Sequence, residues 1–274
     1  PLDLIERFGA DGVRMGMMLC APAGNDILFD DSLCEQGRNF CNKIWNCFRL
    51  IKGWEVADNE MPATNQWGVE WFKAVLAKTQ EEVADLFSKY RLSEALMAIY
   101  KLYCDEFSGW YLEIIKPAYG QPIDRATYEQ TIQFMDTMLK LLHPFMPFIT
   151  EELWQAIEER QEGESLMVSP LNAEQTLDKA AQLLENATQC FDIISAIRNI
   201  RAQKNISPKE VLTLVAPSEL PAVVTKLANV ELAVGAEKSA GSASFIVGTT
   251  EYSVPLEKFI NVDEELKKLE AELA

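Results

Sequence analysis

The sequence predicts a mainly α protein, in which a helical bundle is followed by a small α/β unit and the start of a coiled coil. Three observations carry this prediction. Apolar residues recur at helical spacing from about residue 35 to about 205, with proline and glycine clusters between the segments. After Pro208 the apolar residues alternate as they do in strands. From about 259, leucines recur at the spacing of a coiled coil.

The first 34 residues predict two short helices. Pro1 opens an amphipathic segment that runs to Phe8, where Gly9 interrupts it. A second short helix is expected from Asp11 to Leu19, ending near the sequence APAGND.

The bundle is expected to contain longer helices with recognisable breaks between them. Pro117 to Pro122, and Pro144 with Pro147, lie where helices should end. Thr150 is expected to cap the helix that follows the second of these breaks. The predicted helices are 35 to 53, 69 to 89, 92 to 116, 125 to 143, 150 to 161 and 173 to 204.

The region after Pro208 predicts a small α/β unit. The sequence VLTLVAP alternates like a strand, and residues 219 to 229 predict a short helix. The sequences SASFIVG and EYSVPL predict a hairpin that turns at Gly248 to Thr250. A coiled coil should begin at about 259.

The composition is that of an acidic globular protein. Its 274 residues include 42 acids and 25 Lys and Arg, which gives a formal charge of −17, and no apolar run is long enough for a membrane span. The six cysteines form no CxxC pair and there is a single histidine, so a Cys/His zinc site is not expected. We interpret the cysteines as reduced, mostly buried thiols of a cytoplasmic protein.

Residues 38 to 52, here called the basic window, contrast with this acidic background. They contain four cations and no acid, so their formal charge is +4. On a helix, Phe40, Ile44 and Ile51 fall on one side as a core face. The opposite side carries asparagines and cations: Arg38, Asn39, Asn42, Asn46 and Arg49, flanked by Lys43 and Lys52.

This polar face is interpreted as a contact surface for single-stranded RNA. Each asparagine costs a helix on the order of 0.5 kcal/mol relative to alanine, so a functional reason for three of them is expected. Amides can pair with base edges, and guanidinium groups can bind phosphates or stack on bases. In the alternative interpretation, the asparagines bond neighbouring helices and the cations are merely solvated.

Residues 193 to 209 form a second basic island without an acid. It holds Arg198, Arg201, Lys204 and Lys209 beside a stripe of isoleucines. Two such islands in an acidic chain favour a focused nucleic-acid footprint.

The chain contains, in this order, the stretches PLDLIERFGADGVRMGMML, GNDILFD, GRNFCNKIWNCFRL, DEFSGWYLEIIKP, HPFMPFITEELW and IRNIRAQKNISP. These resemble successive segments of the valyl-tRNA synthetase family over residues 1 to about 208. HPFMPFITEELW and NKIWN are shared with the isoleucyl, leucyl and methionyl enzymes. GNDILFD, IRNIRAQKNI and the terminal heptads favour the valyl family. The same module from an isoleucyl or leucyl enzyme stays an alternative.

The resemblance implies a division into four parts. Residues 1 to 34 would connect the catalytic domain to the rest and contact the tRNA stem, and 35 to 205 would be the helical anticodon-binding domain. Residues 206 to 258 would be the small α/β unit, and 259 to 274 the start of the C-terminal coiled-coil arm. Ser108 and Gly109 depart from the Cys-Asp that the family commonly shows, and Cys104 from a frequent Trp. We expect these departures to reflect local repacking.

The position of NKIWN implies that the basic window lies near the anticodon loop. The candidate tRNA-binding residues are Arg38, Asn39, Asn42, Lys43, Asn46, Arg49, Lys52, Arg198 and Arg201. No catalytic or metal-binding residue is expected in the chain, because the HIGH and KMSKS motifs of the family are not among its residues and would lie upstream.

The resemblance implies a valine–tRNA ligase, which attaches valine to its tRNA with ATP and magnesium. The present chain is expected to bind no cofactor and to be inactive alone. Its expected partner is a valine tRNA, with neither DNA nor a membrane, and we expect a cytoplasmic monomer. A different class of function remains open, in which the chain is an acidic helical scaffold that binds a partner protein through its coiled-coil end.

Overall fold

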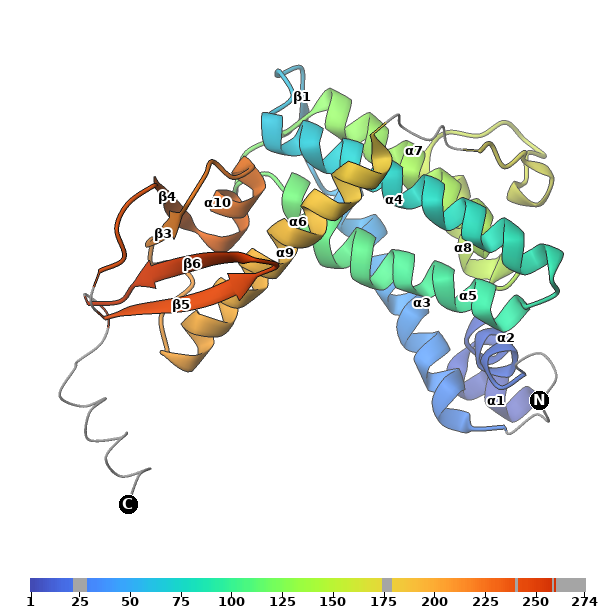
Figure 1. The fold of residues 1–274 in the computed structure, drawn as a ribbon. Helices are drawn as coiled ribbons and strands as arrows, with labels where there is room; N and C mark the ends of the chain where they lie inside the picture. Colours follow the sequence, from blue (N-terminus) through green and yellow to red (C-terminus); the bar gives the residue numbers. More distant parts are fainter. Residues whose placement is uncertain (22–28, 174–178, 240, 258, 260–274) are drawn as a thin grey trace. The chain divides into compact units, whose positions relative to one another are not determined.

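The computed structural model describes residues 1–21, 29–173, 179–239, 241–257 and 259. Its contacts divide the chain into two units, Pro1–Ala180 and Ala181–Ala274. The prediction of a mainly helical protein with a small sheet is confirmed (Figure 1). The predicted coiled coil lies outside the described residues, apart from Phe259, as does much of the sequence APAGND. None of the described helices is both long and apolar enough to cross a membrane.

The first unit is the helical bundle. It begins with α1 (Leu2–Phe8), α2 (Ala10–Leu19) and α3 (Asp31–Lys52). Then come β1 (Val56–Ala57), α4 (Ala63–Ser88), and a continuous helix made of α5 (Leu92–Lys101), η1 (Leu102–Tyr111) and α6 (Leu112–Ile115). The unit continues with β2 (Ile123–Asp124), α7 (Arg125–Leu142), α8 (Pro147–Ile157) and η2 (Leu166–Val168). The predicted helices are therefore present, with ends shifted by a few residues.

Aromatic rings fill the centre of the bundle. The ring of Phe72 on α4 lies 5.3 Å from Phe107, 4.8 Å from Tyr111 and 5.0 Å from Phe134, measured between centroids. These four side chains are fully buried. Tyr111 also shares a 2.7 Å hydrogen bond with the buried hydroxyl of Thr131. This cluster fixes η1 against α4 and α7, because aromatic rings in contact add specific geometry to their burial.

The segment η1 is a π-helix, which the sequence did not predict. It lies within the predicted helix 92 to 116 and widens its middle. π-Helical segments are rare and occur frequently at functional sites. Here the segment faces α3, the helix that carries the basic window.

Helices α2 and α3 cross at glycines. A Cβ at Gly37 would lie 2.5 Å from the carbonyl oxygen of Gly12, and one at Gly16 would lie 2.6 Å from the backbone nitrogen of Cys34. Because no side chain fits at these points, the two backbones approach closely. The N-terminal helices are thus packed directly on the first half of α3.

The start of α8 is capped from a distant part of the chain. Asp11 on α2 is buried, and its carboxylate accepts hydrogen bonds from the backbone N–H of Ile149 at 2.7 Å and of Phe148 at 3.4 Å. Burial raises the pKa of Asp11, while these two hydrogen bonds oppose the rise. The expected N-cap at Thr150 is wrong: the helix begins at Pro147, and the Thr150 hydroxyl donates back to the carbonyl of Met146.

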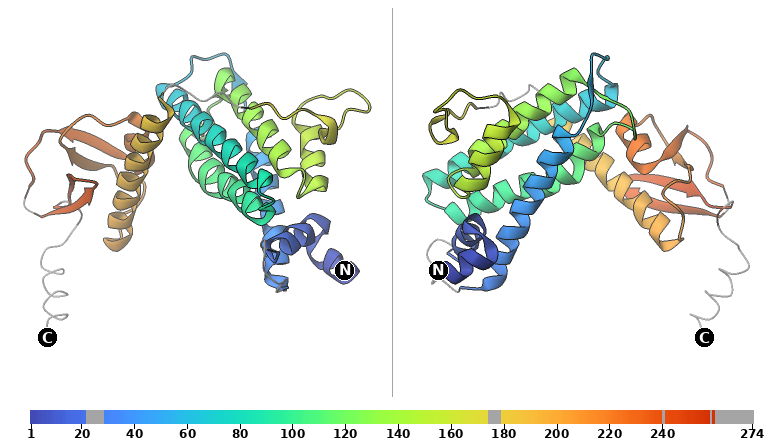
Figure 2. Two further views of the ribbon diagram at one scale, coloured as in Figure 1. Left: turned by 45° about the vertical axis from the view of Figure 1, so that its right-hand side comes forward. Right: turned by 180° about the vertical axis from the view of Figure 1, so that it is seen from behind.

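The second unit is a four-stranded sheet with two helices. Its elements are α9 (Ala180–Gln203, which starts at the last residue of the first unit), β3 (Leu212–Ala216), α10 (Ala222–Ala228), β4 (Val230–Val234), β5 (Ser242–Val247) and β6 (Thr250–Pro255). The strand order is β4-β3-β6-β5, with β3 and β4 parallel and the others antiparallel. Figure 2 shows α9 and α10 beside this sheet.

The predicted hairpin of β5 and β6 is present, with Val247 paired to Thr250. Strand β4 was not predicted. Its sequence, VELAV, begins at Val230, one residue after the C-cap of α10 and directly after the end of the expected helix 219 to 229. The unit boundary also differs from the expected one near 205, because α9 belongs with the sheet.

Candidate nucleic-acid interface

The basic window lies on helix α3, which has a buried apolar face and an exposed polar face. Phe40, Ile44 and Ile51 are buried, as their helical spacing predicts. On the other side, Asn42, Asn46 and Arg49 are exposed. Asp30 caps the helix, accepting a 2.8 Å hydrogen bond from the backbone N–H of Ser32. Arg49 and Lys52 lie in the last turn of α3, where the helix dipole stabilises cations.

The amides of Asn42 and Asn46 are open to a ligand. Within the described part of the chain, neither side chain makes a hydrogen bond, and Arg49 has no ion pair there. Asn39 is exposed and accepts only a long 3.4 Å hydrogen bond from Arg38. These placements oppose the interpretation in which the asparagines serve to bond neighbouring helices.

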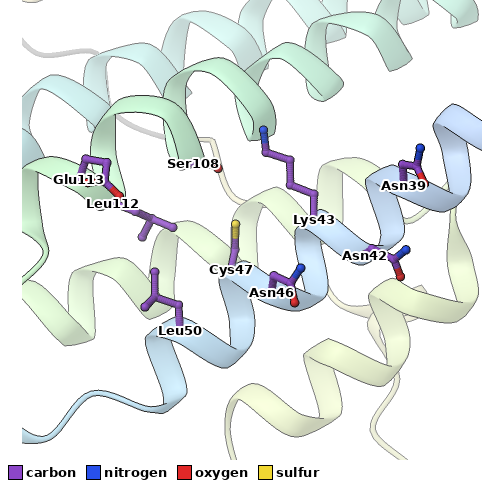
Figure 3. A pocket seen from close by; sticks show the side chains of 9 residues that line it. All are labelled: Asn39, Asn42, Lys43, Asn46, Cys47, Leu50, Ser108, Leu112 and Glu113. Atoms are coloured by element: carbon purple, nitrogen blue, oxygen red, sulfur yellow. The ribbon is translucent and has the colours of Figure 1, made fainter. Parts of the chain in front are cut away.

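A groove lies between α3 and the continuous helix of η1 and α6. We call it the α3 groove; its volume is about 360 Å³, within the range of small-ligand pockets. Figure 3 shows side chains from both helices along it. Its lining residues are Asn39, Asn42, Lys43, Asn46, Cys47, Leu50, Ser108, Leu112 and Glu113.

Lys43 is held at the wall of the α3 groove. Its ammonium donates a 3.3 Å hydrogen bond to the backbone carbonyl of Cys104 in η1. Beside it, burial raises the pKa of the Cys47 thiol, while a hydrogen bond with Ser108 and the charge of Lys43 oppose the rise. The thiol therefore stays neutral, and the positive charge of Lys43 has no thiolate neighbour to cancel it. Figure 3 shows Lys43 pointing toward the neighbouring helix.

Two cations of the candidate set have partners inside the protein. Arg38 pairs with Glu35 at 2.8 Å, and its guanidinium lies 5.7 Å from the Phe8 ring. Lys52 donates a 3.1 Å hydrogen bond to the carbonyl of Ile157, at the C-terminal end of α8. Both remain partly exposed. Their charges contribute to the field around α3, but their side chains are less available than that of Arg49.

The second basic island lies in the second unit. Its Arg201 was expected to bind tRNA, and its position in the structure contradicts this expectation. Its side chain is buried, with 6% of its surface exposed. The guanidinium donates hydrogen bonds to the carbonyls of Ser207 at 2.9 Å, Ala228 at 3.0 Å and Asn229 at 2.9 Å. Arg201 therefore ties α9 to the end of α10 and does not present a cation to RNA.

Arg198 points to the same place but stays exposed. Its guanidinium donates a long 3.5 Å hydrogen bond to the carbonyl of Leu227. Cations near the last carbonyls of a helix stabilise its end. The spacing of the two arginines on α9 is thus explained by α10, whose end they share.

Cys47 and Leu50 of α3 also line the α3 groove and were not among the candidate residues. Three further lining residues, from the neighbouring helix, were missed from the sequence: Ser108, Leu112 and Glu113. They lie about 60 residues beyond the basic window, and no local pattern links them to it. One signal existed, because Ser108 departs from the family pattern. The departure was expected to be repacking, whereas the side chain lines the groove.

Comparison with known proteins identifies the protein family to which the chain belongs. Residues 69–216, more than half of the chain, match the model of the anticodon-binding domain of tRNA ligase. The chain therefore belongs to this family.

Curated relatives of high sequence identity include valine–tRNA ligases. The chain is 62% identical over 279 residues to the valine–tRNA ligase of Phocaeicola vulgatus and 58% identical over 282 residues to that of Bacteroides thetaiotaomicron. It is 33% identical over 300 residues to that of Fusobacterium nucleatum subsp. nucleatum. The whole chain is covered in each case, but it spans only about a third of the relatives' length, 32% in the first two.

One solved structure has a weaker likeness. A chain in the crystal structure of the ternary complex of Agrobacterium radiobacter K84 agnB2 LeuRS-tRNA-LeuAMS aligns with 79% of this chain and 22% of its own. The TM-score is 0.42 and the sequence identity 16%. This degree of structural similarity supports no conclusion about what the chain binds.

Proposed function

We propose that this chain is the tRNA-binding portion of a valine–tRNA ligase, and that the α3 groove with the exposed face of α3 binds the unpaired anticodon loop. The observation that carries the proposal is the pair of exposed amides, Asn42 and Asn46, which have no partner among the described residues. Membership of the anticodon-binding family and the similarity to valine–tRNA ligases support it.

The chemistry of the groove suits unpaired nucleotides. Asparagine amides supply a donor and an acceptor together, which matches the edges of bases. Arg49 and Lys43 supply positive charge for phosphates. Glu113 supplies a carboxylate that accepts from exocyclic amino groups, so it favours bases that carry one. Leu50 and Leu112 provide apolar surface against which a base can lie.

For the complete ligase we propose the activity of its relatives, the attachment of valine to tRNA with ATP and magnesium. The chain alone, about a third of the relatives' length, is proposed to bind tRNA without catalysing this reaction. We further propose a cytoplasmic monomer whose nucleic-acid partner is a valine tRNA, and no binding to DNA or membranes.

Competition among purified tRNAs tests the proposal. Labelled valine tRNA is bound to the chain, and unlabelled valine, isoleucine and leucine tRNAs are added in turn. The proposal predicts that the valine tRNA competes best, because the lining of the groove selects among anticodon bases. Equal competition by all three would contradict valine specificity. A gel shift without any complex would contradict RNA binding and favour a protein-binding scaffold.

A further inference from the structure

Tyr119 is a fully exposed aromatic residue at the tip of a turn that follows α6. Its relative exposure is 106%, the largest among the exposed apolar and aromatic side chains of the described residues. The backbone N–H of Gln121 donates a 2.9 Å hydrogen bond to the carbonyl of Ala118, which closes a four-residue turn. Gly120 has a φ of +73°, as the third position of a type II turn requires. Tyr119 therefore occupies the second position, at the apex.

The loop that carries Tyr119 is held at both ends. On one side it continues directly from α6, where the backbone N–H of Lys116 donates a 2.9 Å hydrogen bond to the carbonyl of Leu112. On the other, β2 pairs with β1, and the N–H of Ile123 donates a 2.8 Å hydrogen bond to the carbonyl of Glu55. Pro117 and Pro122 further restrict the backbone between these anchors. The ring is therefore presented by a defined turn.

This loop lies next to the α3 groove. Glu113 lines the groove, and α6 ends at Ile115. Four extended residues span at most about 14 Å, so Tyr119 cannot be farther than this from the end of α6. The bond to Glu55 also brings the loop to the chain that leaves α3, three residues after Lys52. Stacked nucleotides lie about 3.4 Å apart along a strand, so neighbours of a bound base come within reach.

The surroundings of Tyr119 suit RNA. Residues 117 to 122 contain no acid, in a chain of net charge −17, so phosphates are not repelled by the loop itself. An aromatic ring left in water adds little to folding, but its face can stack on any base. We propose that Tyr119 is a stacking platform for an unpaired base adjacent to the nucleotides in the α3 groove. This inference rests on the proposed function.

The test uses the 274-residue chain and a hairpin with the anticodon stem and loop of valine tRNA. 2-Aminopurine replaces one loop base at a time, because stacking on a ring quenches its fluorescence. Tyr119→Ala is compared with Tyr119→Phe, which keeps the ring. The matched control is Tyr90→Ala: Tyr90 is 84% exposed and lies before α5, at the opposite end of the continuous helix that α6 ends.

At one loop position, wild type and Tyr119→Phe should quench the probe, and Tyr119→Ala should not. Tyr119→Ala should also raise the hairpin Kd by about 5- to 150-fold, the range of one lost base stack, while Tyr90→Ala changes neither signal. Unchanged Kd and quenching in Tyr119→Ala would overturn the stacking role and leave the proposed function standing. A wild-type chain that binds no hairpin would overturn both. Far-UV circular dichroism confirms that each variant is folded.

Discussion

Asn42 and Asn46 are the residues on which the binding proposal depends most. Asparagine is a poor helix former because its side chain competes for backbone hydrogen bonds. Both residues lie in the interior of α3, are exposed, and bond to nothing else in the described part of the chain. They therefore lower the stability of the helix, and no hydrogen bond among the described residues compensates for this loss. A ligand that pairs with their amides would explain their presence.

This reasoning gives a prediction with opposite signs for stability and binding. Asn42→Ala and Asn46→Ala should each raise the free energy of unfolding by about 0.5 kcal/mol, since alanine is the better helix former. Each should also weaken the binding of valine tRNA. Urea unfolding and filter binding measure the two effects.

Asn65→Ala is the control for these variants. Asn65 is buried, and its amide donates a 3.1 Å hydrogen bond to Asp124. Its loss should reduce stability by about 1 to 3 kcal/mol, because Asp124 is left with an unpaired acceptor in a buried site. RNA binding by the folded protein should be unaffected. A loss of stability in Asn42→Ala or Asn46→Ala, with unchanged tRNA binding, would show that these amides are structural.

Single residues also show where sequence reasoning stops. The exposed face of α3 could be predicted, because helical spacing alone separates Phe40 and Ile44 from Asn42 and Asn46. The role of Arg201 could not be predicted, since its acceptors are backbone carbonyls as far as 28 residues away. Every residue has such a carbonyl, so no residue type in the sequence identifies the acceptor. Glu113 was missed for a similar reason, because its place opposite α3 depends on how two helices pack.

At the scale of elements, tertiary contacts decided what local patterns could not. The strands of the hairpin and the helices of the bundle follow from periodicity. The cap of α8 comes from Asp11, more than 130 residues earlier, and so the local candidate Thr150 was wrong. The π-helix η1 is likewise held by the packing of Phe107 and Tyr111 against α4 and α7. No sequence period marks it.

The crossing of α2 and α3 gives a prediction for an element. In Gly37→Ala, the new Cβ would lie 2.5 Å from the carbonyl oxygen of Gly12, so the helices must move apart. We expect a loss of about 1 to 3 kcal/mol, as for other overpacked sites. Urea unfolding, monitored by tryptophan fluorescence, measures this loss of stability. Asn42→Ala on the same helix is the control. Unchanged stability in Gly37→Ala would mean that the crossing is looser than the structure indicates.

At the scale of the whole molecule, the two units should respond separately to mutation. All six tryptophans lie in the first unit, so their fluorescence reports on that unit alone. Arg201→Ala removes a buried guanidinium that serves three carbonyls, and should destabilise the second unit by about 3 kcal/mol. The part of the circular-dichroism transition that comes from the second unit should move to lower temperature, while the tryptophan transition stays in place.

Arg198→Ala provides the comparison, because the hydrogen bond from Arg198 to the carbonyl of Leu227 is long, at 3.5 Å, and exposed. It should cost less than Arg201→Ala. Equal shifts of both transitions in Arg201→Ala would show that the two units unfold as one.

Charge is the property of the whole molecule that bears most on RNA binding. A chain of net charge −17 should repel a polyanion unless a few cations meet its phosphates directly. The basic window supplies four cations without an acid, and the structure leaves Arg49 exposed and without an ion pair among the described residues. Binding should therefore depend on few contacts and respond strongly to the loss of one.

The salt dependence of tRNA affinity tests this central claim most directly. If about four phosphates are bound, the logarithm of the association constant should fall with the logarithm of salt concentration at a slope of about −3. Arg49→Ala should reduce the magnitude of that slope by about 0.7 to 1. Lys89→Ala, whose lysine already pairs with Asp85, should leave it unchanged. A slope near zero in the wild-type chain, or the same slope in Arg49→Ala, would contradict the assignment of α3 as the RNA-binding helix.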